Sequence, residues 1–79
     1  MDTHTEVQMV PLFGPEPDTW RARHAHLFRS DESLRFYLRR HRDRLLRDRA
    51  ITMVAGRWFC VPGVMERVVF AIGNERAAA

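Results

Sequence analysis

The sequence predicts a mainly α-helical domain with one β-hairpin, in the order helix, short turn, helix, hairpin, helix. Apolar residues recur at helical spacing in three separate stretches. A fourth stretch, residues 50–61, is rich in β-branched and aromatic residues around a central glycine, which is typical of a hairpin. With 79 residues, of which 46% are hydrophobic, the chain is the size of one domain. We expect an N-terminal arm over residues 1–18, this domain over residues 19–74 and a frayed tail over residues 75–79.

The arm contains several residues that are incompatible with a helix. They are Pro11, Gly14, Pro15 and Pro17. Residues 7–10 are apolar enough for a short extended segment. Leu12 and Phe13 are expected to dock either on the body of the domain or on a second copy of the protein.

The first helix is predicted over residues 19–28. Asp18 is a good N-cap, because a carboxylate there can accept from the free amides of the first turn. The spacing i, i+4, i+7 and i+8 puts four residues on one buried face, namely Trp20, His24, Leu27 and Phe28. A break at residues 29–30 then makes the turn before the second helix very short.

The second helix is predicted to begin after Ser30, a second N-cap, and to continue through Arg47. Asp31 and Glu32 lie in its first turn, where the positive end of the helix dipole favours carboxylates. Steps of 100° put one set of residues on a core-facing side: Leu34, Tyr37, Leu38, His41 and Leu45.

The hairpin is expected to turn at Ala55-Gly56, and Pro62 is well suited to open the last helix. The buried face of that helix is predicted to comprise Met65, Val68, Val69 and Ile72. Gly73-Asn74 is expected to end it. Two helices with a tight joint, followed by a hairpin, make a winged helix-turn-helix the expected fold, with the hairpin as the wing.

Charge is distributed unevenly along the chain. All 13 basic residues are arginine. Residues 1–20 contain four carboxylates and no arginine, whereas residues 21–57 contain eleven arginines against four carboxylates. A GC-rich genome explains the absence of lysine, but it does not explain this clustering. The basic centre indicates an anionic partner.

Part of this order resembles a known family. The segments that carry the resemblance are residues 30–42 (SDESLRFYLRRHR), Ala50-Ile51, Gly56-Arg57-Trp58 and residues 62–72 (PGVMERVVFAI). They resemble the small excisionase-like winged helix-turn-helix proteins of bacterial mobile elements. The resemblance implies that the second helix enters the major groove of double-stranded DNA and that the Gly-Arg turn of the wing touches the backbone or minor groove. Many of these proteins have a glycine after the second helix, where this chain has Asp48-Arg49, so the helix either continues or ends in a strained turn.

The second helix carries two rows of arginine beside its apolar face. One row is Arg35, Arg39 and Arg42; the other is Arg40, Arg44 and Arg47. A guanidinium can donate two parallel hydrogen bonds to phosphate or to the O6/N7 edge of guanine. We therefore expect the first row to enter the groove and Arg57 of the wing to make a second contact. The second row, Arg40, Arg44 and Arg47, is expected to serve phosphates or a protein partner.

Two observations leave alternatives open. Asp31 and Glu32 stand where a recognition helix meets DNA, and they repel phosphate unless they face away or accept from a cytosine amine. A solvated charged face or a protein interface therefore also fits the helix. Phe36 projects between the arginine rows, and an exposed aromatic residue usually marks a contact with a second copy, a partner or the arm.

Several function classes find no support in the sequence. No paired carboxylates, Ser-His-acid arrangement or phosphate-binding glycine loop is present, so we expect no enzyme and no cofactor. A lone cysteine, Cys60, excludes a zinc site built on cysteine pairs and fits a reducing cytoplasm, and no metal site is expected. The polar first residues do not resemble a signal peptide, and no apolar run reaches the roughly 18 residues of a membrane span.

Two functional hypotheses follow from these features. The first is a cytoplasmic DNA-binding protein, a transcriptional regulator or recombination accessory factor, that binds double-stranded DNA. Such small modules often bind as homodimers or cooperative arrays, because one small domain makes few contacts. The second is an adaptor or inhibitor whose arginine rows and Phe36 dock on a partner protein. An RNA-binding variant lacks a set of stacking aromatics on a sheet face.

Overall fold

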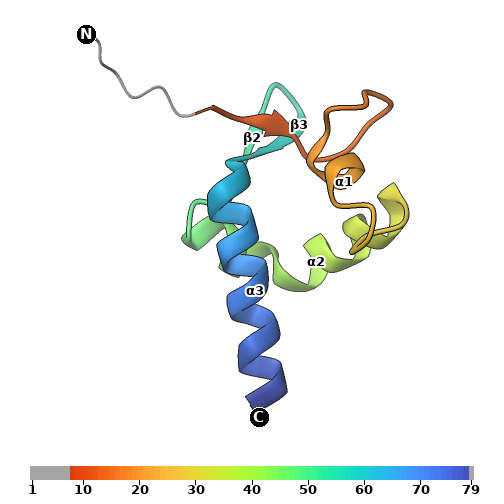
Figure 1. Cartoon of the computed structure of the whole chain (residues 1–79). Coiled ribbons are helices and arrows are strands. Elements are labelled where there is room, and N and C mark those ends of the chain that lie inside the picture. Colours follow the sequence, from red (N-terminus) through yellow and green to blue (C-terminus); the bar gives the residue numbers. More distant parts are fainter. Residues whose placement is uncertain (1–7, 79) are drawn as a thin grey trace, which may run out of the picture.

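The computed structural model describes residues 8–78, which form three helices and a small antiparallel sheet (Figure 1). The elements are β1 (Val10–Pro11), α1 (Trp20–Arg23), α2 (Asp31–Arg47), β2 (Ile51–Val54), β3 (Arg57–Cys60) and α3 (Pro62–Ala78). The predicted combination of helices with a hairpin is present, in a mixed α/β arrangement. Within residues 8–78, no helix combines the length and apolar character needed to cross a membrane.

The sheet has the strand order β1-β3-β2, so the hairpin strand β3 lies at its centre. The hairpin lies where the sequence predicts it, with Val54 opposite Arg57 next to the turn. Ala55 and Gly56 form this turn with φ of 52° and 78°. Two positive φ values are what a two-residue type I′ turn requires, and only glycine adopts them without a steric cost.

The segment before α1 is built into the body of the domain. Val10 pairs with Cys60, and Pro11 pairs with Phe59 at the outer strand β1, where a missing N–H is tolerated. The amide of Leu12 donates to the carbonyl of Trp58 at 3.0 Å, and the Leu12 side chain is completely buried. Leu12 therefore docks on the body of its own chain, while the predicted arm before residue 8 lies outside the described residues.

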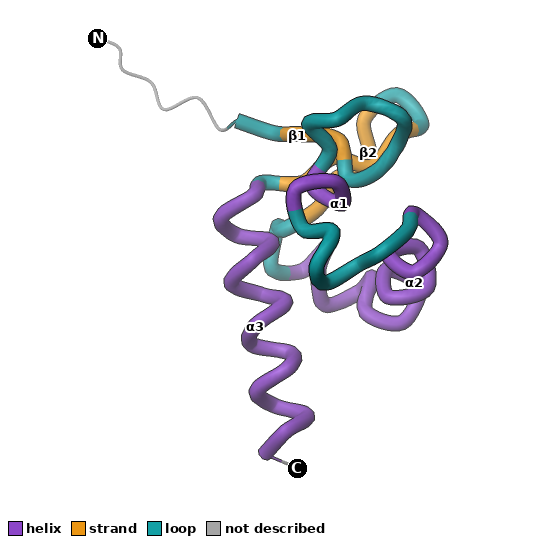
Figure 2. The backbone as a smooth tube through the Cα atoms, turned by 45° about the vertical axis from the view of Figure 1, so that its right-hand side comes forward, coloured by secondary structure: helices purple, strands orange, loops and turns teal. Residues whose placement is uncertain are grey.

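Helix α1 is much shorter than the predicted helix over residues 19–28. Thr19 is its N-cap in place of Asp18, because the Thr19 hydroxyl accepts from the amide of Ala22. His24 leaves the helical conformation with φ −120° and ψ 40°. The Arg21 guanidinium donates to the carbonyls of Phe28 and Arg29, which folds residues 24–30 back as a loop (Figure 2). The connection to α2 is therefore longer than predicted.

Helix α2 begins and ends with clear signals. Ser30 and Ser33 form a reciprocal capping box, which confirms Ser30 as the N-cap. At the other end, the amide of Ala50 donates to Leu45 and that of Arg49 to Leu46, which is the hydrogen-bond pattern of a Schellman motif. Arg49 has a φ of 63° at the position that usually holds glycine. Of the two expected endings, the strained turn is the one that forms.

The interior of α2 contains a kink at His41, whose φ of −122° and ψ of 17° are not helical. The kink divides the helix into residues 31–40 and 42–47. The predicted core face is retained across it, because Leu34, Leu38 and Leu45 are all buried.

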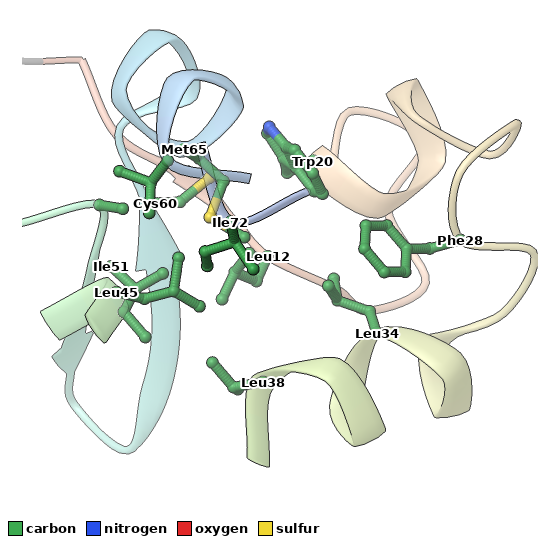
Figure 3. Close-up of a cluster of buried hydrophobic side chains, with 12 residues drawn as sticks. Leu12, Trp20, Phe28, Leu34, Leu38, Leu45, Ile51, Cys60, Met65 and Ile72 are labelled. Atoms are coloured by element: carbon green, nitrogen blue, oxygen red, sulfur yellow. The ribbon is translucent and has the colours of Figure 1, made fainter. Parts of the chain in front are cut away.

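The core lies between the sheet and the inner faces of α2 and α3 (Figure 3). Leu12 lies near the leucines of α2 and Ile72 of α3, and Trp20 and Phe28 close one side (Figure 3). Met65, Val68 and Ile72 of α3 are buried as predicted. The predicted stop at Gly73-Asn74 is wrong, since α3 continues to Ala78 and extends away from the body (Figure 1).

Candidate nucleic-acid interface

A shallow groove lies between α2 and the hairpin, and its walls contain the first of the two predicted arginine rows. Its α2 wall is formed by Arg35, Arg39 and Arg42, above Leu38. Phe13 and Trp58 line it from the other side, and the groove encloses about 220 Å³. An adjoining depression shares Phe13, Arg35 and Trp58 and continues along residues 14–16 to Gly56 and Arg57. We call the two together the hairpin groove.

The row Arg35, Arg39 and Arg42, which we call the hairpin-side stripe, is exposed. The guanidinium carbon of Arg35 lies 4.5 Å from the centre of the Phe13 ring, a cation–π contact that orients this side chain. Within residues 8–78, none of the three arginines forms an ion pair. Their donors therefore have no carboxylate from this part of the chain to satisfy them.

Arg57 lies in the same groove but has an acidic partner. Its Nη2 donates to Oε1 of Glu16 at 2.6 Å, and the hydrogen bond lowers the pKa of the Glu16 carboxyl below its usual range. The loop that carries Glu16 connects β1 to α1. Arg57 therefore faces the predicted site, but its charge is neutralised there.

Arg40, Arg44 and Arg47, which we call the α3-side stripe, have different surroundings. The Nε of Arg44 donates to Asp48 at 2.8 Å, and both terminal nitrogens donate to the two oxygens of Glu75 on α3 at 2.9 Å each. These bonds raise the pKa of Arg44 and lower those of Asp48 and Glu75. The Nε of Arg47 lies 3.6 Å from Oδ1 of Asp48. Arg44 thus fixes α3 against α2. Its guanidinium donors are already bonded to carboxylates and are not free for another anion.

The remaining predicted contact residues differ in access. Leu12 is buried, and Phe13 is partly buried beneath Arg35. Phe36 is 55% exposed, and the Arg40 guanidinium lies 5.9 Å from its ring centre. Phe36 is therefore the member of this predicted contact set that is accessible at the surface.

The acidic start of α2 is partly neutralised. Asp31 accepts from Nε of Arg21 at 3.1 Å and not from Arg35, its neighbour one turn along the helix. Of four possible i, i+4 pairs on α2 that the sequence offers, the described residues contain only Arg44–Asp48. Glu32 remains exposed without an ion pair in residues 8–78.

His24 and Cys60 have structural roles. His24 stacks on Trp20 at 4.1 Å, and its ring joins the Trp20 carbonyl to Glu66 of α3. Cys60 is buried, and burial raises the pKa of its thiol to about 12. Among residues 8–78, no group of three His, Cys, Asp or Glu side chains could hold a metal ion.

The sequence does not reveal the other walls of the groove. Its patterns place Trp58 in the hairpin and Phe13 in a docking role, and they show Glu16 only as part of an acidic segment. The meeting of these residues depends on the pairing of β1 with β3, for which the two-residue strand Val10–Pro11 gives little signal.

No family model, curated protein or solved structure matches this chain. The groove itself must therefore support any functional conclusion.

Proposed function

We propose that the protein binds double-stranded DNA through the hairpin-side stripe of α2. The carrying observation is that three arginines without carboxylate partners in residues 8–78 share one groove with the β-hairpin. A helix flanked by a hairpin is the arrangement expected of a winged helix-turn-helix, in which α2 enters the major groove and the hairpin acts as the wing. The pairing of Asp31 with Arg21 supports this proposal, because it reduces the repulsion of phosphate at the start of α2.

The biological role that fits this proposal is that of a cytoplasmic transcriptional regulator or recombination accessory factor. The resemblance to excisionase-like proteins of mobile elements supports it. A single small domain makes few contacts with DNA, so binding as a homodimer, with Phe36 in the contact between copies, belongs to the same proposal. No catalytic step or cofactor is part of it.

The proposal is tested by fluorescence anisotropy with a random-sequence duplex at several salt concentrations. Removing one arginine that contacts a phosphate changes the slope of log K against log salt by about 0.9. Wild type is expected to bind with a steep slope, and Arg35→Ala/Arg39→Ala to bind more weakly with a slope shallower by about 1.8. Circular dichroism of both proteins controls for folding. Absence of duplex binding by folded wild type at low salt would overturn the proposal.

A second candidate is a protein-binding adaptor or inhibitor. The observation that favours it is Phe36, 55% exposed in the middle of an arginine surface, as in an interface with an aromatic anchor and a charged rim. It predicts weak duplex binding and a stoichiometric complex with an acidic protein. Phe36→Ala should abolish that complex and leave duplex binding unchanged.

A further inference from the structure

Glu16 is placed so that it controls the one arginine that the hairpin contributes to the groove. Arg57 and Glu16 are 40% and 42% exposed, so solvent and ligands reach both side chains. The pair lies at the end of the groove that also contains Gly56 and Arg35. A phosphate that approached Arg57 would therefore meet the Glu16 carboxylate at the same place.

The backbone of the loop fits the Arg57 guanidinium closely. Gly14 has a φ of 144°, and a Cβ added there would lie 2.7 Å from Nη2 of Arg57 and 2.7 Å from Oε1 of Glu16. The guanidinium and the carboxylate therefore both pack directly against the loop backbone at Gly14. A side chain at position 14 would push both groups aside, and the φ of 144° favours glycine, so the loop that connects β1 to α1 leaves room for the pair.

A carboxylate and a phosphate compete for the same donors of a guanidinium. Both are oxyanions that accept parallel hydrogen bonds from the guanidinium fork. The Arg57–Glu16 pair has no net charge, so it releases no counterion from DNA when it lies beside a phosphate. The three arginines of the hairpin-side stripe have no such competitor within residues 8–78.

We infer that Glu16 is a selectivity-determining residue, which withholds Arg57 from the phosphates of DNA and so limits sequence-independent binding. This inference rests on the proposed function. Duplex contacts of the wild-type protein then come from α2, and Arg57 adds to them only when the carboxylate is removed.

The test compares Glu16→Gln with Asp18→Asn in the salt-dependent duplex assay. Glutamine keeps a hydrogen-bond acceptor for Arg57 but removes the charge. Asp18 lies in the same loop, is exposed and forms no ion pair in the described residues, so its variant makes the same change in net charge. We expect Glu16→Gln to bind the random duplex severalfold more tightly with a slope steeper by about 0.9, and Asp18→Asn to keep the wild-type slope.

The Arg57→Ala background identifies the cause. The double variant Arg57→Ala/Glu16→Gln should give no steeper slope than Arg57→Ala alone. Equal slopes for Glu16→Gln and Asp18→Asn would overturn the inference and leave the proposed function intact. Weaker binding by Glu16→Gln would also overturn it, because Glu16 would then position Arg57 for DNA. If folded wild type binds no duplex at all, it is the proposed function that fails.

Discussion

The two arginine stripes of α2 contain three guanidinium groups each, but their surroundings differ. On the hairpin side, Arg35, Arg39 and Arg42 lie beside the rings of Phe13 and Trp58, without an ion pair inside residues 8–78. On the α3 side, Arg44 alone donates three hydrogen bonds to carboxylates. The number of arginines on a helix therefore does not give the number that are free to contact an anion. What separates the stripes is where the fold places its few acidic residues.

The largest expected effect is a loss of folding stability when Leu12, which precedes Phe13 of the hairpin groove in the chain, is shortened. Leu12→Ala should lower the free energy of unfolding by about 2–5 kcal/mol, because Leu12 is completely buried and anchors the loop that carries Phe13 and Glu16. Chemical denaturation measures this change. Leu46→Ala, at a site 41% exposed, should change it by less than about 0.5 kcal/mol. Similar small effects for both variants would show that the segment before α1 is not part of the core.

A smaller effect is expected on the α3 side. Arg44→Ala should lower the urea midpoint, because it leaves Asp48 and Glu75 without their shared partner and loosens α3. Arg39→Ala, which removes the same charge from the hairpin-side stripe, should leave the midpoint near that of wild type. If Arg39→Ala destabilised the protein more than Arg44→Ala, the structural role assigned to Arg44 would be contradicted.

Much of the fold was predictable because it depends on local signals. The capping residue Ser30, the leucine face of α2 and the turn at Ala55-Gly56 each leave a pattern within a few residues. The length of α1 was not predictable, because its end is fixed by Arg21, which bonds carbonyls seven and eight residues away. Helix α3 continues past Gly73 to Glu75, which accepts a hydrogen bond from Arg44. These two residues are 31 positions apart, so no local pattern indicates their contact.

The candidate site was predictable in part for the same reason. The hairpin-side stripe follows from helical spacing alone. The neutralisation of Arg57 by Glu16 and of Arg44 by Glu75 joins segments that are 41 and 31 residues apart, and no spacing in the sequence indicates either pair.

Arg49, in the turn that connects α2 to the hairpin, is a site where a substitution should increase stability. Arg49→Gly should stabilise the protein by about 1 kcal/mol, because glycine adopts the φ of 63° without the steric cost that other residues incur. Thermal or urea denaturation measures the gain. Arg49→Ala removes the same side chain but keeps that cost, so it should give no such gain. Equal stability of the two variants would contradict a strained turn at this position.

The smallest effect is the pH dependence of stability that comes from His41, the residue at the kink of α2. Burial, with Arg40, Arg44 and Arg76 nearby, lowers the pKa of His41 below its ordinary 6.5. Above pH 6.5 the imidazole is neutral in both folded and unfolded chains, and stability does not depend on it. As pH falls below 6.5, the unfolded chain binds the proton first, so stability falls until the lower folded pKa is reached.

His41→Gln removes the imidazole and tests whether His41 makes the protein less stable as the pH falls. Urea midpoints measured at pH ~7.5 and ~5.5, on either side of the ordinary histidine pKa, should fall less for His41→Gln than for wild type. An equal or larger fall in the variant would contradict a lowered pKa at His41.

We propose that the hairpin-side stripe contacts phosphate, whereas Arg44 of the α3-side stripe holds α3 against α2. The most direct test of this claim is the salt dependence of duplex binding for Arg39→Ala/Arg42→Ala beside Arg44→Ala/Arg47→Ala, since both variants remove two positive charges from the same helix. We predict a slope shallower by about 1.8 for the first variant and a slope near that of wild type for the second. An equal or larger decrease in slope for the second variant would contradict the claim.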